Sequence, residues 1–244
     1  MTAPATPVPG GGTGPVVLDR VGTGRGELVL RAFAGRYEII SNGVFLMDTA
    51  DGASERALVD AAVARCAVPA PRLLIGGLGV GFSLLRAVGH RHLAAIEVVE
   101  IEPALIGWHR THLRHLTAAA LADPRVRVIE ADILDWLAGS VPDPDGTGAT
   151  AGYDAICLDT DNGPNWLVSP DNADLYAARG LDLAAARLRP GGVLAVWSAS
   201  PDDGYRQRLA RHVGPVEVLA VPHRRGEPDL VYLARRDPAG PAGG

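Results

Sequence analysis

Short apolar runs of strand length alternate with segments of helical spacing over most of the chain. This alternation predicts an α/β fold in which parallel strands form a doubly wound sheet with helices on both faces. The last two runs are expected to close the sheet as an antiparallel pair, which makes it seven-stranded. The predicted strands are residues 73–75, 95–100, 126–129, 155–158, 193–197, 216–221 and 230–234. The predicted helices are residues 83–88, 103–116, 133–137, 175–188 and 206–212.

A different pattern precedes this alternation. Three β-rich runs between residues 28 and 47 are separated by turn residues, among them Asn42-Gly43, and predict a small β meander. A helix over 54–65 should follow, with Ser54 as its N-cap. The Pro- and Gly-rich ends are expected to be disordered. The expected units are a tail at 1–15, the meander at 16–52, a nucleoside-binding domain at 53–236 and a tail at 237–244.

The first strand of the predicted sheet ends in a glycine-rich turn. Gly76, Gly77, Gly79 and Gly81 stand between the apolar run and the next helical segment. Strand, tight turn and helix N-terminus together hold nucleotides or nucleosides in α/β sheets, because glycines let the backbone approach the ligand. Since glycine also serves ordinary turns and C-caps, the turn predicts a binding loop only with support from elsewhere.

That support comes from carboxylates at the ends of successive strands. Glu100 ends the second predicted strand, Asp132 follows the third, and Asp159 ends the fourth. Each alone could be a helix cap or a solvated loop acid. All three fall where ligands bind in open sheets, so a nucleoside site is favoured. An acid there can accept hydrogen bonds from a ribose diol or an adenine amino group.

Composition and net charge limit the classes of binding partner that the chain is expected to have. The 244 residues carry a formal net charge of −5, with 47% hydrophobic and 21% charged residues. An acidic chain without a basic stripe does not favour nucleic acid or an anionic membrane. Cys66 and Cys157 lie in apolar contexts and are expected to be reduced core residues. We therefore expect a cytoplasmic protein with neither a signal peptide nor a membrane span.

Three histidines and one tryptophan are weaker candidates for a functional role. His109, His112 and His115 recur every third residue, which on a helix turns them too far apart for one metal ion. We expect a solvated helix face there and no metal site. Trp166 follows Asp159 closely and is expected either to wall a pocket or to pack in the core.

As a set, the motifs resemble those of the class I S-adenosylmethionine-dependent methyltransferases, and within them the spermidine synthase-like branch. The resemblance extends from Glu27 to Arg235. It rests on the motifs at 75–81 (IGGLGVG), 99–102 (VEIE), 131–133 (ADI), 158–161 (LDTD) and 188–192 (LRPGG).

The resemblance implies a Rossmann-like methyltransferase fold and a donor of the S-adenosylmethionine type, with decarboxylated S-adenosylmethionine as the alternative. The turn from Gly77 to Gly81 would pass the methionyl part of the donor. Glu100, followed by Ile101, would hold the ribose, and Asp132, followed by Ile133, would hold the adenine. Related proteins pair through such meanders, so a homodimer is expected.

The resemblance also implies an acceptor site. Asp159 stands at the position of the catalytic acid, and Asp161 is the second candidate for that role. Asn162, Trp166 and Glu55 are expected to bind the acceptor, a small molecule.

Three departures from the branch bear on the reaction. Spermidine synthases carry an aspartate in the glycine turn where this chain has Gly79, and that carboxylate selects against a donor with a carboxylate of its own. The loop from Asp159 to Pro164 is shortened. A Tyr-His-Glu motif is reduced to Ala53-Ser54-Glu55. The departures favour intact S-adenosylmethionine as donor.

Three functions therefore stand open. The leading one is a methyltransferase acting on an amine or hydroxyl of a small molecule. The second is an aminopropyltransferase that uses the decarboxylated donor. The third is a nucleoside-binding protein without catalytic activity.

Overall fold

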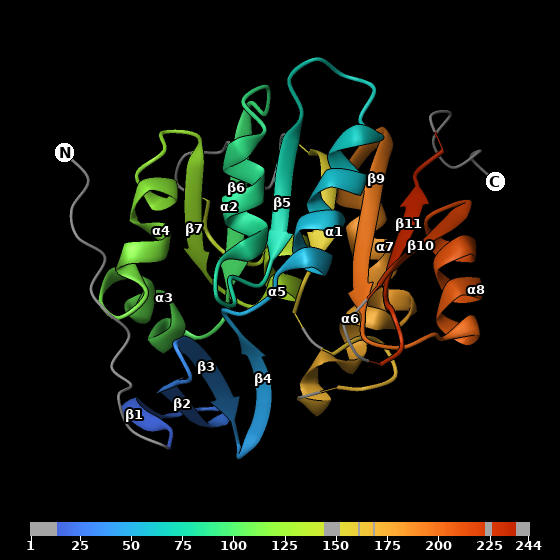
Figure 1. The fold of residues 1–244 in the computed structure, drawn as a ribbon. Coiled ribbons are helices and arrows are strands. Elements are labelled where there is room, and N and C mark those ends of the chain that lie inside the picture. Colours follow the sequence, from blue (N-terminus) through green and yellow to red (C-terminus); the bar gives the residue numbers. More distant parts are fainter. Residues whose placement is uncertain (1–13, 144–151, 161, 168, 223–225, 238–244) are drawn as a thin grey trace.

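The computed structural model describes residues 14–143, 152–160, 162–167, 169–222 and 226–237. Within them lie two sheets, one of seven strands and one of four (Figure 1). The predicted α/β class with a small N-terminal β unit is therefore confirmed. The predicted tails fall almost wholly outside the described residues, and the domain boundaries stay a prediction.

The larger sheet has the predicted seven strands. Its order is β10-β11-β9-β8-β5-β6-β7, in which β10 and β11 are antiparallel to their neighbours and the others are parallel. The strands are β5 (Arg72–Gly76), β6 (Ala95–Glu100), β7 (Val126–Glu130), β8 (Tyr153–Leu158), β9 (Leu188–Ser198), β10 (Val216–Val221) and β11 (Asp229–Arg235). Because alternate side chains of a strand point to opposite faces, the sheet has two cores.

Helices cover both faces. One core joins Leu73 and Ile75 to α1, α2, α3 and α4, while the other joins Leu74 to α5, α6, α7 and α8. The helices are α1 (Ala53–Ala64), α2 (Phe82–Gly89), α3 (Pro103–Arg110), α4 (Arg114–Leu121), α5 (Ile133–Ala138), α6 (Ala173–Tyr176), α7 (Ala178–Arg187) and α8 (Asp203–His212). Both cysteines are free, and Cys157 is buried in β8. None of the described helices has the length and hydropathy needed to cross a bilayer.

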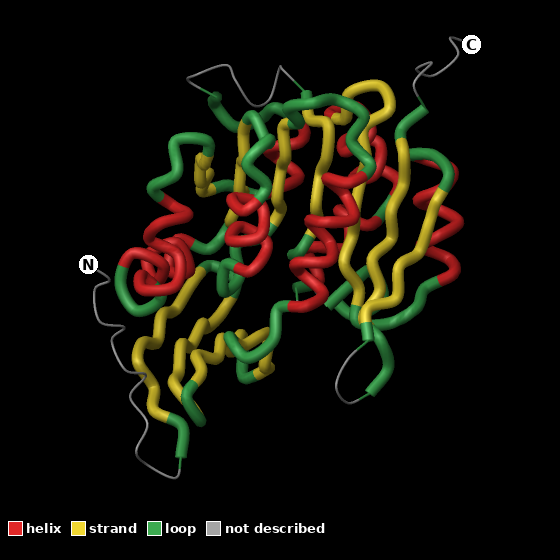
Figure 2. The backbone as a smooth tube through the Cα atoms, turned by 45° about the horizontal axis from the view of Figure 1, so that its top comes forward, coloured by secondary structure: helices red, strands yellow, loops and turns green. Residues whose placement is uncertain are grey.

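The smaller sheet lies at the carboxyl ends of the parallel strands (Figures 1 and 2). Its strands are β1 (Val16–Thr23), β2 (Gly26–Phe33), β3 (Arg36–Ser41) and β4 (Val44–Asp48), paired in that order and antiparallel. The sequence predicted the last three, and β1 is an addition. Leu30 and Ile39 are fully buried and share a core with Leu78 and Val80 of the glycine turn. The small sheet therefore packs against the predicted binding loop.

Two predicted helices are interrupted in the structure. The segment 103–116 divides between α3 and α4, where Thr111 Oγ1 donates to the carbonyl of Gly107 at 3.0 Å and competes with the helical bonding pattern. The segment 175–188 begins earlier, at Ala173, and breaks at the extended residue Ala177.

Two local predictions were wrong. Ser54 is not an N-cap: Gly52 precedes α1, and the Ser54 hydroxyl donates to Glu55 instead. The strand predicted over 193–197 begins earlier, at Leu188, because residues 188–192 also lie within β9. That strand end is held from outside the local sequence, because Gly191 N–H donates to the carbonyl of Arg236 and Arg236 N–H donates to that of Gly192.

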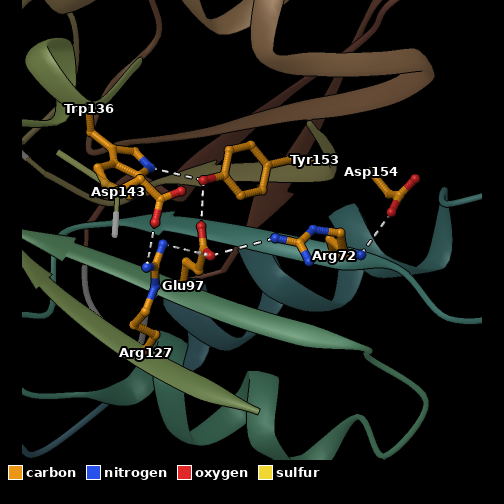
Figure 3. A network of polar contacts seen from close by, with 7 residues as sticks. All are labelled: Arg72, Glu97, Arg127, Trp136, Asp143, Tyr153 and Asp154. Atoms are coloured by element: carbon orange, nitrogen blue, oxygen red, sulfur yellow. Dashed lines mark hydrogen bonds and ion pairs between the residues drawn. The ribbon is translucent and has the colours of Figure 1, made fainter. Parts of the chain in front are cut away.

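A buried charge network stabilises the far end of the sheet (Figure 3). Glu97 of β6 is 3% exposed and accepts from Arg127 at 3.1 Å, from Tyr153 Oη at 2.5 Å, and lies 3.6 Å from Arg72. Trp136 Nε1 donates to Tyr153 Oη at 2.9 Å. Burial raises the pKa of Tyr153, and its bond to Glu97 adds to that rise, so the phenol keeps its proton and donates. These residues lie toward the amino ends of the strands, away from the glycine turn.

Candidate functional site

Two pockets adjoin at the carboxyl ends of the parallel strands. β5 lies between β6 and β8, and such a reversal of strand order is where open α/β sheets bind ligands. We name the pockets after one acid in each, the Glu100 pocket and the Glu55 pocket. Four of the described residues line both pockets: Leu46, Met47, Asp159 and Thr160. A ligand in one pocket can therefore meet a ligand in the other beside Asp159.

Most of the sequence-predicted site residues line these pockets. Those in the Glu100 pocket are Gly77, Gly79, Glu100, Ile101, Asp132, Ile133 and Asp159. Those in the Glu55 pocket are Glu55, Asp159, Asn162 and Trp166. Gly76 and Gly81 belong to the turn but are not among the described residues that line either pocket. Asp161 lies outside the described residues.

The glycine turn passes close to other chain segments. Gly77 has φ +94°, and a Cβ there would overlap the carbonyl oxygen of Asp159. Gly79 has φ +50°, and its Cβ would lie 2.6 Å from Met47 Sδ. Met47 of β4 therefore occupies the space that any side chain at position 79 would need. The glycine turn and the small sheet therefore pack directly against each other where Gly79 meets Met47.

His109 of α3 contacts the glycine turn through a hydrogen bond. It is 1% exposed, so the expectation of a solvated face is wrong for this residue. Its Nε2 lies 2.8 Å from the carbonyl oxygen of Gly79, and Nδ1 lies 2.9 Å from Thr117 Oγ1. Burial lowers the pKa of His109, which favours the neutral ring. A carbonyl can only accept, so Nε2–H donates to Gly79 and Nδ1 accepts from Thr117.

Glu100 ends β6 beneath the turn. Its Oε2 accepts from Leu78 N–H at 2.8 Å and its Oε1 from Glu102 N–H at 2.9 Å. Burial raises the pKa of this carboxyl, and the backbone donors oppose the rise. Each oxygen has a second lone pair, so the carboxylate is oriented by the backbone and can still accept from a ligand.

Asp132 is the N-cap of α5 and faces the same pocket. Its Oδ1 accepts from Leu134 N–H at 2.8 Å. Its Oδ2 accepts from Arg25 at 3.1 Å, across the pocket from the turn between β1 and β2. The residue thus combines its structural role as a cap with a place in the pocket wall.

Asp159 stands at the junction of the pockets. Ser83 Oγ donates to its Oδ2 at 2.7 Å. Burial raises the pKa of Asp159 to about 6, the Ser83 bond opposes the rise, and the charge of Asp229 adds to it. The next residue, Thr160, is tied by its hydroxyl to Tyr176 Oη at 3.1 Å. The carboxyl is therefore held in place, and its pKa lies above that of an ordinary aspartate.

The Glu55 pocket is acidic and partly aromatic. Glu55, Asp159 and Asp229 line it together with Trp166 and Trp197. Burial raises the pKa of Glu55 to about 7, with further contributions from the charges of Asp159 and Asp229. No lysine or arginine is among the described residues that line this pocket. A cationic ligand would relieve the repulsion among these carboxylates.

Residues of this region that the sequence interpretation missed include Arg25, Met47, Ser83, His109 and Asp229. Asp229 comes one residue before the predicted start of its strand, and no local motif marks it. Met47 was assigned to a strand without a role. For His109 the sequence did hold a signal, since this residue occupies a largely apolar helix. The sequence did not identify its partner, the carbonyl of Gly79.

A metal site is not indicated. In the part of the chain that the structure describes, no three His, Cys, Asp or Glu side chains form a group that could hold a metal ion.

Comparison with known proteins gives sequence matches over about half of the chain. It is 35% identical over 132 residues to a polyamine aminopropyltransferase of Mycobacterium tuberculosis, across 53% of this chain and 23% of that protein. It is 31% identical over 136 residues to putrescine N-methyltransferase 1 of Nicotiana tabacum, across 54% of this chain and 32% of that protein. The matches therefore span about a quarter to a third of these relatives' length. No protein-family model matches the chain.

Solved structures resemble the chain over most of its length. The spermidine synthase of Thermotoga maritima superposes with a TM-score of 0.69 at 14% identity, covering 91% of this chain and 73% of that one. A spermidine synthase in complex with the transition-state analogue AdoDATO gives a TM-score of 0.72 at 16% identity, covering 91% and 75%. At such identities the likeness establishes the fold.

Proposed function

We propose that this chain, which is related by sequence and fold to the spermidine synthase-like branch of the class I S-adenosylmethionine-dependent methyltransferases, transfers a group from an S-adenosyl donor to an amine of a small cationic acceptor. The observation that carries the proposal is the pair of pockets that meet at Asp159. The Glu100 pocket would take the donor and the Glu55 pocket the acceptor.

The residues of the Glu100 pocket fit an adenosyl nucleoside. Gly77 and Gly79 of the turn stand where a Cβ would overlap a neighbouring group. Since they carry no side chain, their backbone borders the pocket. Glu100 offers acceptor oxygens for a ribose diol, and Asp132 offers them for an amino group on the base. The acids Glu100, Glu102, Asp132 and Asp159 line this pocket and would repel a pyrophosphate, which favours a nucleoside over a dinucleotide.

The acidic Glu55 pocket favours an amine over a hydroxyl acceptor. A bound donor supplies an electrophilic carbon attached to a positively charged sulfur. Asp159 and Glu55 would hold the acceptor's ammonium group at the junction and then take its proton on a carboxylate oxygen. Bases with pKa values of about 6 and 7 accept this proton more readily than ordinary carboxylates. Holding the amine in line with the donor supplies most of the remaining effect.

Methyl transfer is the leading reaction, because Gly79 places no carboxylate beside the donor's amino-acid end. Gly79 lines the Glu100 pocket, and no hydrogen bond from its N–H to another described residue is found, so this N–H is available to a donor carboxylate. Aminopropyl transfer is the second candidate, favoured by the sequence match to a polyamine aminopropyltransferase.

Product mass separates the alternatives. The protein is incubated with each donor and with putrescine, spermidine and monoamines of matched length, and the products are weighed. Gain of a methyl group supports the leading reaction, and gain of an aminopropyl group supports the second. Nucleoside binding without any product would instead favour a binding protein.

A homodimer remains part of the proposal. The outer strands of the small sheet, β1 and β4, carry exposed apolar residues, including Val17 at 51% and Val44 at 48%. Such patches on sheet edges mark interaction surfaces. Light scattering at micromolar concentration tests the dimer, and a strictly monomeric protein would contradict it.

A further inference from the structure

The turn between β1 and β2 reaches across the Glu100 pocket to the larger domain. Thr23 Oγ1 donates to Glu102 at 3.4 Å, just before α3. Arg25 donates to Asp132 Oδ2 at 3.1 Å and to Asn172 Oδ1 at 3.5 Å. These three partners come from separate segments around the pocket. The turn therefore forms part of the pocket's roof.

Arg25 is held at a defined place in this turn. Its N–H donates to Thr23 Oγ1 at 3.1 Å, and its carbonyl accepts from Asn42 Nδ2 at 3.1 Å. Asn42 Oδ1 in turn accepts from Glu27 N–H at 2.8 Å. The hydrogen bonds fix the backbone on both sides of Arg25, so its side chain is directed at the pocket by the turn itself.

Charge sets Arg25 apart from the other residues of the pocket. Among the described residues that line it, Arg25 is the sole cation, whereas Glu100, Glu102, Asp132 and Asp159 are acids. The side chain is 26% exposed, so its pairing with Asp132 is only partly screened by water. Without Arg25, the Asp132 carboxylate would keep one anchor, the N–H of Leu134.

We propose that Arg25 is a positioning residue for the base end of the donor. It orients Asp132 from the opposite wall, so that a lone pair of that carboxylate faces the amino group of the base, and it closes the roof over the base. The inference rests on the proposed function, since it requires an adenosyl ligand in this pocket. It gives the small sheet a part in ligand binding.

Calorimetric titration with S-adenosylmethionine and S-adenosylhomocysteine tests this role. Arg25→Ala should weaken both ligands by about tenfold, because a charge-assisted hydrogen bond in the wall is lost. Arg25→Lys, which keeps the charge but not the forked geometry, should recover part of the affinity. Arg20→Ala is the matched control: it removes an exposed ion pair with Glu27 on the same hairpin and should change nothing.

A second set of titrations tests whether Arg25 acts through Asp132. In an Asp132→Ala background, Arg25→Ala should cost less than about twofold, because the partner is already absent. If wild type and Arg25→Ala bind the ligands with equal affinity, this inference is overturned and the proposed function is not. The same holds if Arg25→Ala still weakens binding tenfold in the Asp132→Ala background. A wild-type protein that binds neither ligand would overturn the proposed function and this inference with it. Thermal unfolding of each variant identifies a loss that comes from misfolding, and Arg25→Lys then carries the test.

Discussion

A carboxylate introduced at position 79 should reverse the choice of donor. Wild type is expected to bind S-adenosylmethionine at least as tightly as the decarboxylated form, because Gly79 presents only backbone. Gly79→Asp alone is a poor test, since its Cβ would lie 2.6 Å from Met47 Sδ. Met47→Ala removes that obstacle. The left-handed φ of +50° is one that aspartate adopts more readily than most residues. The informative protein is therefore the double variant Gly79→Asp/Met47→Ala.

The expected size of the effect follows from Coulomb's law. Two like charges about 4 Å apart at an effective dielectric of about 20 repel by roughly 4 kcal/mol. Relaxation and solvent screening reduce this value, because the pocket is open to water. A loss of more than about tenfold for the carboxylate-bearing donor would remain, since tenfold corresponds to about 1.4 kcal/mol. The decarboxylated donor, which has only the positive amine, should bind the variant more tightly.

Isothermal titration of both donors into three proteins measures this preference. Gly79→Asn/Met47→Ala is the matched control, because it has nearly the same shape as the aspartate variant and no charge. It should shift both donors alike and leave their ratio unchanged. The reasoning is refuted if the aspartate and asparagine variants show the same ratio. A wild type that prefers the decarboxylated donor tenfold or more would favour aminopropyl transfer instead.

Four further predictions concern acidic residues. Activity should rise with pH through the range 6 to 7 as Asp159 and Glu55 ionise, and Glu55→Gln should remove the step nearest pH 7 in a pH–rate profile. Because the pKa of Glu55 is raised on folding, thermal stability should fall as pH rises from 4.5 to about 7, and a slope that Glu55→Gln leaves unaltered would contradict the assignment. Glu100→Ala should weaken adenosyl ligands by at least about tenfold in calorimetry, since hydrogen bonds to charged groups contribute about 1.5–3 kcal/mol, and unchanged affinity would remove Glu100 from the ribose site. Glu97→Ala should lower the free energy of unfolding by about 3–5 kcal/mol in a denaturant titration, because Arg72 and Arg127 lose a buried partner. A loss below about 1 kcal/mol would show that the network contributes little to stability.

Much of the fold and part of the candidate site could be predicted from the sequence, because their signals are local. The bounds predicted for β6 and β10 agree with the structure, since an apolar run bounded by polar or turn residues is complete within a few positions. The turn from Gly76 to Gly81 and the acids Glu100 and Asp132 follow from the same logic: each lies at the carboxyl end of a strand or within two residues of it, and these ends of parallel strands meet at one edge.

Tertiary structure decided how these local pieces are combined. Arg25 meets Asp132 across 107 positions of sequence, Ser83 meets Asp159 across 76, and His109 meets Gly79 across 30. No local pattern specifies such a pairing, because it depends on how segments distant in sequence pack together. The carboxyl pKa values are set in the same way, since burial by distant segments raises them and neighbouring acids add to the rise. The sequence by itself determined the strands and the acids at their ends, whereas only packing decided that Met47 fills the space above Gly79, because the two meet where one sheet packs on the other.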